Sequence, residues 1–308
     1  MAPLILGSRG SALALAQVSL VREALLAAHP GLPIELKVIT TSGDRRQEVR
    51  AGEGSDAGLK GLFTKEIQDA LLDHSIHAAI HSLKDLPGVV PPNLSLAAVL
   101  PRADTSDLLI SRTPTLNRQE PALPFRVATG SIRRSRQLKW LHPGIEIVDL
   151  RGNVPTRLQK LATQSLDAIV LARAGLDRLG YPIVDGLLHC DSGPFHAVPL
   201  DILPAIGQGA IGIETRSDDL PTRALFSPIC HLPTHLCIQV ERELLRLLNG
   251  TCHLPVAARA TLQGDRLHAQ AIIFPDDETL PPVQAQDSAP SSDPESLAQT
   301  LFHQLRPS

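Results

Sequence analysis

Residues 125–141 read FRVATGSIRRSRQLKWL, and their pattern decides the fold class. The apolar run FRVAT (125–129) is typical of a short buried strand, and the segment 131–141 has a helical period. A strand that leads directly into a helix is the repeating unit of α/β proteins. The turn between them places hydroxyls and arginines at a helix N-terminus, where backbone N–H groups and the helix dipole favour an anion. The stretch therefore predicts an α/β fold with an anion site beyond the end of a strand.

The same alternation of strand and helix extends over most of the chain. Strands are expected at 3–6, 34–40, 77–83, 94–100, 125–129, 145–150, 167–172 and 210–215, and helices at about 11–28, 63–73, 131–141 and 154–164. Strands that are apolar on both faces favour largely parallel sheets. The elements form two blocks, before and after the polar stretch LPRADTSD (100–107), which we interpret as a crossover between two α/β domains.

A third, smaller α+β unit is expected from about residue 229 onward. An amphipathic helix covers 234–248, with Thr234 as the expected N-cap and Asn249-Gly250 as its stop. The strand-like RLHAQAIIF (266–274) and a Pro/Ser/Asp-rich stretch (275–293) follow, and Asp293-Pro294 then starts a last helix.

Composition restricts the class of protein. The chain has 308 residues, of which 43% are hydrophobic and 20% charged, with a net charge of -3, as expected for a soluble globular protein. This charge and an aromatic content of 3% disfavour nucleic acid as a partner. The cysteines at 190, 230, 237 and 252 form no C-x-x-C pair and indicate free thiols in a reducing compartment. Arg9 interrupts the only signal-like N-terminal stretch and no run of about 20 apolar residues occurs, so we expect a cytoplasmic protein with no membrane span.

Three patterns imitate functional motifs. GQGAIG (207–212) satisfies G-x-G-x-x-G but precedes a strand, which is the wrong context for dinucleotide binding. CHLPTHLC (230–237) has no common zinc-ligand spacing, and we expect no metal site. His81, Ser82 and Asp85 do not form a triad, because neighbours on one strand point to opposite faces.

Basic residues are concentrated between residues 126 and 178, where the sequence has ten basic and four acidic residues. Three strand-to-helix turns carry arginine: GSRGSA (7–12), TGSIRRSRQ (129–137) and RGNVPTR (151–157). A solvated basic face is the alternative for any one of them. The guanidinium group binds carboxylate or phosphate with two parallel hydrogen bonds, so the three turns together indicate a small polyanionic ligand in a cleft.

Two further segments bear on that cleft. In HAAIHSLKDLP (77–87) an apolar strand ends in Lys84 and Asp85, either as an ordinary polar strand end or as part of a site. The glycine-rich, charged loop 42–61 is either a lid or a disordered segment, and both interpretations imply that it moves.

Eight motifs, in this order, make the chain resemble the hydroxymethylbilane synthase (porphobilinogen deaminase) family. They are GSRGSALALAQ, KGLFTKEI, AAIHSLKDLP, ATGSIRRSRQL, LRGNVPTRLQKL, DAIVLARAGLDRLG, LPAIGQGAIGIETR and NGTCHLPVA. The resemblance extends from residue 4 to about residue 260. It implies two periplasmic-binding-protein-like (type II), doubly wound α/β domains around a cleft, followed by a small C-terminal α+β domain. It also implies the boundaries 1–101 with 209–228 for the first domain, 102–208 for the second and 229–308 for the third.

The resemblance implies a transferase that joins four porphobilinogen molecules head to tail into hydroxymethylbilane, with release of four ammonia molecules, in tetrapyrrole (heme) biosynthesis. Growth would take place on a dipyrromethane cofactor held by a thioether to Cys252, and Asp85 would be the catalytic carboxylate. The resemblance also implies that the product passes to uroporphyrinogen-III synthase. Nothing in the sequence argues against a monomer, and a monomer is the expectation. The alternative is a non-catalytic two-domain binder of a small polycarboxylate, which would need neither Cys252 nor Asp85.

The family motifs assign roles to the polar groups of the cleft. Cofactor-binding residues would be Lys84, Thr129, Ser131, Arg133, Arg134, Arg157 and Gln208. Substrate-binding residues would be Arg9, Ser11, Arg151 and Arg178, and the lid and its base would contain Lys60 and Phe63. The chain departs from the family's usual residues at Leu59, Gly130, Arg173 and Thr251, and none of these departures removes a catalytic group.

Overall fold

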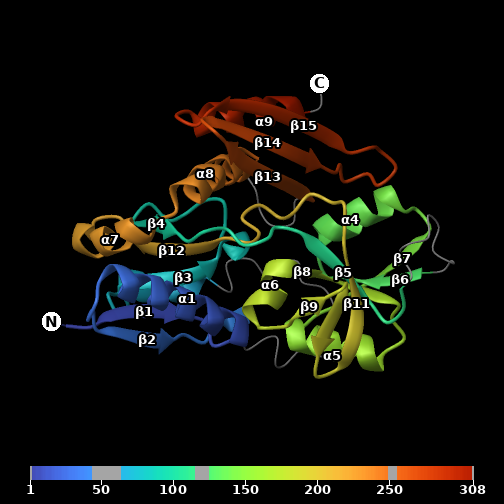
Figure 1. Ribbon diagram of the computed structural model, residues 1–308. Helices are drawn as coiled ribbons and strands as arrows, with labels where there is room; N and C mark the ends of the chain where they lie inside the picture. Colours follow the sequence, from blue (N-terminus) through green and yellow to red (C-terminus); the bar gives the residue numbers. More distant parts are fainter. Residues whose placement is uncertain (1, 44–63, 115–124, 249–254, 307–308) are drawn as a thin grey trace.

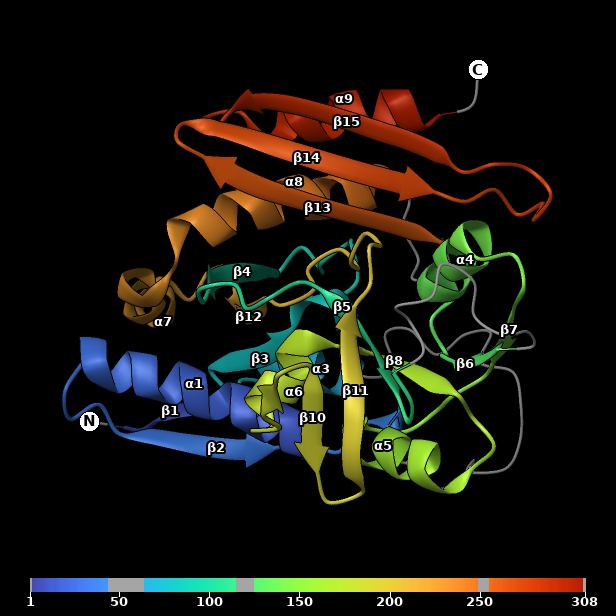
Figure 2. The same ribbon diagram turned by 45° about the vertical axis from the view of Figure 1, so that its right-hand side comes forward.

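The computed structural model describes residues 2–43, 64–114, 125–248 and 255–306. Most of the expected lid loop 42–61, with Leu59 and Lys60, lies outside the described residues, as do Phe63, Thr251 and Cys252. The described chain forms three domains, each with its own sheet. Figure 1 shows the two α/β domains side by side and the C-terminal domain above them, and the turned view in Figure 2 keeps this arrangement.

The first domain contains a five-stranded sheet in the order β2-β1-β3-β12-β4. Its strands are β1 (Leu4–Ser8), β2 (Ile34–Val38), β3 (Ala78–Ser82), β4 (Leu94–Val99) and β12 (Ile211–Arg216). Its helices are α1 (Ala12–Ala28), α3 (Lys65–Leu72) and α7 (Leu220–Phe226). The β1, β2 and β3 strands are parallel, whereas β12 is antiparallel to both of its neighbours. All five strands were predicted from the sequence. The strands β1, β3 and β12 are largely buried, whereas the edge strand β2 is mostly exposed. Only two of the four strand pairs, β1–β2 and β1–β3, are parallel, so the largely parallel sheet expected from the sequence is not found in this domain.

The second domain contains a seven-stranded sheet in the order β7-β6-β8-β5-β11-β10-β9. Its strands are β5 (Asp107–Ser111), β6 (Phe125–Ala128), β7 (Ile145–Val148), β8 (Ala168–Ala172), β9 (Ile183–Val184), β10 (Leu187–Cys190) and β11 (Gly193–Pro199). Its helices are α4 (Ile132–Leu141), α5 (Val154–Thr163) and α6 (Arg173–Arg178). The sequence analysis missed β5 and β9–β11. The three strands β9–β11 are partly solvated and therefore lack a continuous apolar run.

The first five strands of the second sheet repeat the order of the first sheet. In each domain one antiparallel strand belongs to a segment that has just crossed from the other domain, β5 after the first crossing and β12 after the return. This exchange is the topology of periplasmic-binding-protein-like type II domains, so the predicted fold class is confirmed.

The C-terminal domain packs two helices against a three-stranded antiparallel sheet. It contains β13 (Val256–Gln263), β14 (Arg266–Ile273), β15 (Val283–Pro290), α8 (Leu232–Leu247) and α9 (Pro294–Leu305), and it follows the short helix η3 (Ser227–Ile229). Asp293 caps α9 as predicted. The predicted N-cap Thr234 is wrong, because α8 begins earlier and His231 accepts the capping hydrogen bond from Thr234 N. The strands β13 and β15 were both missed, β15 within the Pro/Ser/Asp-rich stretch.

The three domains meet where the chain crosses between them. Arg102, in the first crossing, donates two hydrogen bonds to the buried Glu241 of α8, at 2.6 and 3.0 Å. Glu241 also accepts from Gly207 N in the returning segment and from Ala260 N in β13. One carboxylate therefore connects both crossings to the C-terminal domain. No helix among the described residues is long and apolar enough to cross a membrane.

Candidate active site

The Lys84–Asp85 pair lies on a short helix, η1 (Leu83–Asp85), that directly follows β3. Leu83 is 2% exposed, and its backbone N–H donates to Ala210 O at 3.1 Å. Gly207, at φ +73°, lies so close that an added Cβ would be 3.0 Å from the Leu83 carbonyl carbon. This anchoring leaves Lys84 partly buried and Asp85 exposed. The GQGAIG motif is therefore a tight turn beneath the site that leads into β12, and it precedes a strand as the sequence predicted.

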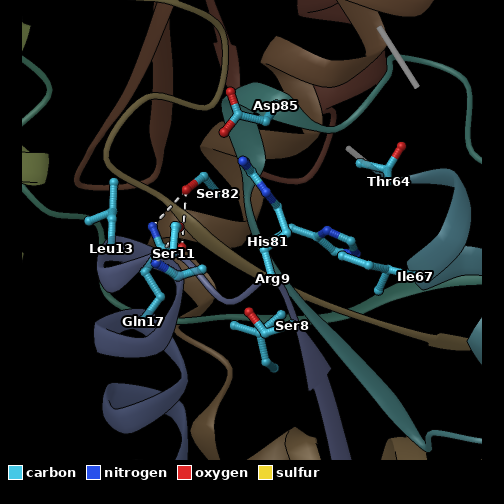
Figure 3. Close-up of a pocket in the computed structure, with 12 residues that line it drawn as sticks. Ser8, Arg9, Ser11, Leu13, Gln17, Thr64, Ile67, His81, Ser82 and Asp85 are labelled. Atoms are coloured by element: carbon cyan, nitrogen blue, oxygen red, sulfur yellow. Dashed lines mark hydrogen bonds between the residues drawn. The ribbon is translucent and has the colours of Figure 1, made fainter. Parts of the chain in front are cut away.

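A cavity of about 60 Å³ lies in the first domain and reaches Asp85. It brings together three of the predicted residues, Arg9 after β1, Ser11 at the start of α1, and Asp85 (Figure 3). Ser11 is the N-cap of α1, and its hydroxyl accepts from Ala14 N at 3.3 Å. The α1 N-terminus and the Arg9 guanidinium give this end of the cavity a positive potential.

Further lining residues of this cavity were not predicted as site residues. Gln17 Nε2 donates to Ser82 Oγ at 2.7 Å, which connects α1 to the end of β3 (Figure 3). His81 also lines the cavity, and its Nε2 lies 3.0 Å from a carboxylate oxygen of the fully buried Glu214. No helical spacing from Ser11 indicates Gln17, which is six residues further on, and its contact with Ser82 joins residues 65 positions apart.

The two arginines at the start of α4 are nearly fully buried, Arg133 at 6% and Arg134 at 5% exposed. The sequence analysis expected their guanidinium groups to face a ligand at an open helix N-terminus. Arg133 Nη2 instead donates to Asp107 Oδ2 at 2.7 Å, and Arg134 Nη2 donates to Asp107 Oδ1 at 2.6 Å. The anion at this helix start is thus an aspartate of the protein itself, at the beginning of β5.

Other predicted groups surround this ion pair. Gln208 is 1% exposed, and its Nε2 donates to Asp107 Oδ1 at 2.9 Å and to Thr105 O at 2.8 Å. Thr129 Oγ1 accepts from Ser131 N at 3.2 Å. Ser131 is the N-cap of α4, but its side chain makes no capping hydrogen bond. Arg133, Arg134 and Gln208 therefore form one hydrogen-bonded cluster centred on Asp107. Thr129 and Ser131 bond to each other next to it.

The remaining predicted arginines differ in burial. Arg157 and Arg178 are partly buried, and each donates to a glycine carbonyl, Gly152 O at 2.7 Å and Gly209 O at 2.6 Å. The bond from Arg178 joins the second domain to the segment returning to the first. Arg151 is more exposed, with 53% of its side chain accessible, and its Nε donates to Asp149 Oδ2 at 3.0 Å.

Charged groups of the two domains shift one another's pKa values. Burial lowers the pKa of Lys84 to about 8; Asp85 and Asp107 oppose this shift, while Arg134 and Arg133 add to it. Burial also lowers the pKa of Arg157 to about 10, with contributions from Arg134 and Arg151, and Asp85 is among the charges that oppose it. Groups of the first domain thus act electrostatically on groups of the second. Several cations that depress one another's pKa values form a site that lacks anionic charge.

Two departures from the family's usual residues have structural explanations. A Cβ added at Gly130 would lie 2.8 Å from Leu150 O, so the turn after β6 packs directly on the turn after β7. Arg173 begins α6, and its Nε lies 3.5 Å from Asp177 and 3.9 Å from Asp104 in the first crossing. Neither residue contacts Asp85 or Asp107 through a hydrogen bond or ion pair within the described part of the chain.

This arrangement combines an exposed carboxylate with a surplus of buried and half-buried cations. A carboxylate in such a place can stabilise a positive charge that develops on a ligand, while the cations hold the ligand's acidic groups. Within the described ranges, no group of three or more His, Cys, Asp and Glu side chains is arranged to hold a metal ion.

Comparison with protein families identifies both parts of the chain. Residues 4–224 match the model described as "porphobilinogen deaminase, dipyromethane cofactor binding domain". Residues 235–306 match "porphobilinogen deaminase, C-terminal domain". Together the two matches cover nearly the whole sequence.

Curated proteins of similar length give the same result. The porphobilinogen deaminase of Syntrophobacter fumaroxidans is 44% identical over 259 residues, which are 83% of this chain and 79% of the relative. That of Roseiflexus sp. (strain RS-1) is 41% identical over 303 residues, 98% of this chain and 95% of the relative.

Similarity to solved structures is distant. A mutant of full-length BenM has 15% identity and a TM-score of 0.44, with 81% of this chain and 68% of that chain covered. The periplasmic VFT2 domain of Bordetella pertussis BvgS has 14% identity and a TM-score of 0.41, with 74% and 85% covered. The fold class of this chain rests on the strand order of its own two sheets.

Proposed function

The chain belongs to the porphobilinogen deaminase family, and from that premise we propose that it catalyses the hydroxymethylbilane synthase reaction with Asp85 as the catalytic carboxylate. The reaction is a transferase step of tetrapyrrole (heme) biosynthesis. Four porphobilinogen molecules are joined head to tail, and four ammonia molecules leave. The observation that carries the role of Asp85 is its position as an exposed carboxylate opposite the cations of the second domain.

Asp85 would act on the positive charge of the reacting pyrrole. Loss of ammonia from porphobilinogen leaves a cationic azafulvene, and a fixed carboxylate near the pyrrole N–H stabilises this charge as it develops. The same carboxylate can move a proton to the leaving amine or from the new bond. Lys84, the adjacent cation, would help to keep Asp85 anionic and bind a carboxylate of the substrate.

The basic groups would hold the acidic side chains of substrate and product. Each porphobilinogen carries an acetate and a propionate, so carboxylates accumulate as the chain grows. We assign substrate carboxylates to Arg9, Ser11, Arg151 and Arg178. We assign cofactor binding to Lys84, Thr129, Ser131, Arg133, Arg134, Arg157 and Gln208, with Cys252 as the covalent attachment and Lys60 and Phe63 in the lid.

The residues around Asp107 fit a dipyrromethane group. Among the described residues, Arg134 Nε and Gln208 Oε1 are buried without a hydrogen-bond partner. The first is a donor suited to a carboxylate, and the second is an acceptor suited to a pyrrole N–H. When bound, the dipyrromethane group supplies the terminal pyrrole to which the first substrate is joined. The protein's part is to neutralise its carboxylates and to exclude other orientations.

We further propose the division 1–101 with 209–228, 102–208 and 229–308 for the three domains, a monomer in solution, a cytoplasmic location, and transfer of the product to uroporphyrinogen-III synthase. The alternative, a non-catalytic binder of polycarboxylates, is not favoured, because the curated relatives are named as enzymes. A binder of this kind would also have no use for a covalently modified Cys252.

Two measurements test the proposal together. The purified protein is incubated with porphobilinogen, and ammonia and the linear tetrapyrrole are measured; the intact mass is recorded before substrate is added. We expect about four ammonia molecules for each product, and added mass of two pyrrole units that is absent from Cys252→Ser. Active protein with the unmodified mass would contradict the cofactor assignment. Tight porphobilinogen binding without ammonia release would favour the binder.

A further inference from the structure

Asp107 is a fully buried carboxylate that none of the roles above includes. It is the first residue of β5, directly after the first crossing between the α/β domains, and it is 0% exposed. A buried carboxylate is costly unless charged partners and hydrogen bonds compensate for its lost hydration. The four residues that follow it, Leu108–Ser111, are buried in the sheet, so Asp107 cannot turn outward without displacing the strand.

The partners of Asp107 come from two separate segments. Its two oxygens each accept from one guanidinium group, Oδ2 from Arg133 and Oδ1 from Arg134, and Oδ1 also accepts from the Gln208 amide. The arginines lie in the first turn of α4, and Gln208 lies in the segment that returns to the first domain. One carboxylate thus orients three of the residues assigned to cofactor binding.

Each guanidinium group is also held on a second side. Arg133 Nη1 donates to Leu203 O at 2.7 Å, and Arg134 Nη1 donates to Val170 O at 2.9 Å. These contacts fix the plane of both groups, because a guanidinium group donates only within its plane. Because these contacts hold Arg134 Nη1 and Nη2, the direction of its Nε–H is set before any ligand is present. Within the described part of the chain, Arg134 Nε is buried and has no hydrogen-bond partner.

Asp107 also lowers the repulsion within the cluster. Burial raises the pKa of Asp107, but Arg134 and Arg133 lower it more strongly, and the net pKa is well below that of an ordinary aspartate. The carboxylate is therefore ionised at neutral pH. Without it, Lys84, Arg133 and Arg134 would repel one another more strongly, and the exposed Asp85 beside Lys84 would be the counter-charge that remains. One internal anion permits several cations to remain close enough to share one ligand.

We infer that Asp107 is a positioning residue for the cofactor: it holds Arg133, Arg134 and Gln208 in the arrangement that receives the dipyrromethane carboxylates and a pyrrole N–H. This inference rests on the proposed function, since it assumes that these three groups bind the cofactor. Asp107 contacts neither the substrate nor the cofactor in this role. It fixes the planes of the two guanidinium groups. It also accepts from the Gln208 amide nitrogen, which leaves Gln208 Oε1 for the ligand.

The competing explanation is a structural ion pair that merely stabilises the second domain. The two explanations differ in what is lost when the charge is removed from a protein that still folds. A structural pair affects only the melting temperature. A positioning residue also affects cofactor occupancy, because a guanidinium group displaced by about 1 Å no longer meets its carboxylate.

The test compares Asp107→Asn, Asp107→Glu and the control Asp219→Asn, each as the full chain. Asp219 pairs with Arg216 in a mostly buried ion pair and caps α7, at a place remote from Asp85. Asparagine can retain that cap, so the control loses the charge of a comparable Arg–Asp pair without affecting the cleft. For each protein the intact mass gives the fraction that carries two pyrrole units, circular dichroism gives the melting temperature, and porphobilinogen kinetics give kcat and KM for the loaded fraction.

We expect Asp107→Asn to reduce cofactor occupancy at least about tenfold at a temperature where it is folded. Asp107→Glu, which keeps the charge but has a longer side chain, should have an occupancy between that of Asp107→Asn and that of wild type. Asp219→Asn should remain fully loaded even if its melting temperature falls as much. Full occupancy and an unchanged KM in folded Asp107→Asn would overturn the inference.

If Asp107→Asn does not fold, Asp107→Glu decides. Its longer side chain should displace both arginines, so occupancy should fall and KM for porphobilinogen should rise at least about threefold, with circular dichroism unchanged. Wild-type occupancy and KM in this variant would overturn the inference. An unmodified mass in the wild-type protein would instead contradict the proposed function, so the two failures are distinguishable.

Discussion

The strand-to-helix turns after β1 and β6 occupy equivalent places in the topology of the two α/β domains. They differ in the hydrogen bonds and ion pairs that the first residues of the helix make. After β1, the Ser11 hydroxyl accepts from Ala14 N and closes the start of α1. After β6, the Ser131 side chain makes no such bond, and the arginines that follow it turn inward to Asp107. One helix start is thus capped by its own serine, whereas the other is organised by an aspartate that is 26 residues from Arg133 in the sequence.

The two carboxylates of the site differ in the same way. Asp85 is exposed at the end of a buried strand, and Asp107 is fully buried at the beginning of one. An exposed carboxylate keeps its solvation and can exchange water for a substrate cation. A buried one is already neutralised and can only orient its partners. The comparison teaches that a carboxylate close to a group of cations acts on the ligand only if its own hydrogen-bonding capacity remains open.

The largest effect is expected for Asp85→Ala. Loss of the only carboxylate assigned to the developing cation should lower the rate of ammonia release by about 10³. The melting temperature should not change, because the side chain is exposed. Asp85→Asn, which keeps the shape without the charge, is the matched variant. Near-normal turnover in either variant would remove the proposed distinction between the two aspartates.

The second prediction concerns Arg134→Leu, with Arg151→Leu as the control. Removal of Arg134 leaves Asp107 with a single cationic partner, so the free energy of unfolding should fall by about 3 kcal/mol and elongation should stop early. Arg151 is half exposed and pairs with an exposed aspartate, so its loss should change stability by less than about 1 kcal/mol. Urea unfolding and gel separation of enzyme–pyrrole intermediates measure both effects. Equal stability losses would show that burial does not distinguish the two arginines.

The third prediction concerns Lys84→Met and has a defined pH dependence. The pKa of Lys84 is about 8 in the folded protein, below its ordinary value of 10.5, because the ammonium group is buried among cations. Below pH 8 the Lys84 side chain is protonated in both the folded and the unfolded state. The folded state then bears the full free-energy cost of burying the ammonium charge. Between pH 8 and 10.5 the unfolded state binds more protons, so wild-type stability should rise with pH.

Lys84→Met should therefore be more stable than wild type at about pH 7, by about 1 to 3 kcal/mol, while it binds porphobilinogen more weakly. The stability difference should disappear near pH 10.5, the ordinary pKa of the side chain. Urea unfolding of both proteins at about pH 7, 9 and 10.5 measures it. A methionine variant that is less stable than wild type at neutral pH would show that the ammonium group is well paired in the ligand-free protein.

The smallest effect is expected for the two helix caps. Ser11→Ala removes a capping hydrogen bond and should lower the free energy of unfolding by about 1 kcal/mol. Ser131→Ala removes no such bond and should change stability by less than about 0.5 kcal/mol. Thermal unfolding of the two variants side by side measures the difference. A larger loss at Ser131 would contradict the distinction between the two helix starts.

Most of the fold could be predicted from local patterns. The five strands of the first sheet and three of the second were predicted from short apolar runs, because strands buried in a sheet need apolar residues at most positions. The edge strand β2 is an exception, since it is mostly exposed and alternates apolar and charged residues. The strands β5, β9–β11, β13 and β15 were missed. In β5 the run is only five residues long and begins with an aspartate, and in β15 small and polar residues alternate along a partly solvated strand.

The site was predicted in part. Asp85, Arg9 and Ser11 lie around one cavity, as the order of the motifs led us to expect. Asp107 and Gln17 were not predicted as site residues, because their roles depend on contacts with residues far along the chain. Arg133 and Arg134 were expected to present open guanidinium groups, and no local signal indicates that β5 brings a carboxylate to them.

The sequence by itself determined the residue types that each turn presents, the alternation of strands and helices, and the resemblance to the family, since all three depend on neighbouring residues. Only the tertiary structure decided which charges remain available. Asp85 follows the end of one strand and Asp107 begins another, and the sequence near each gives no measure of its burial. Burial depends on how the crossing segments pack, and burial decides whether a carboxylate is neutralised by the protein or left for the ligand.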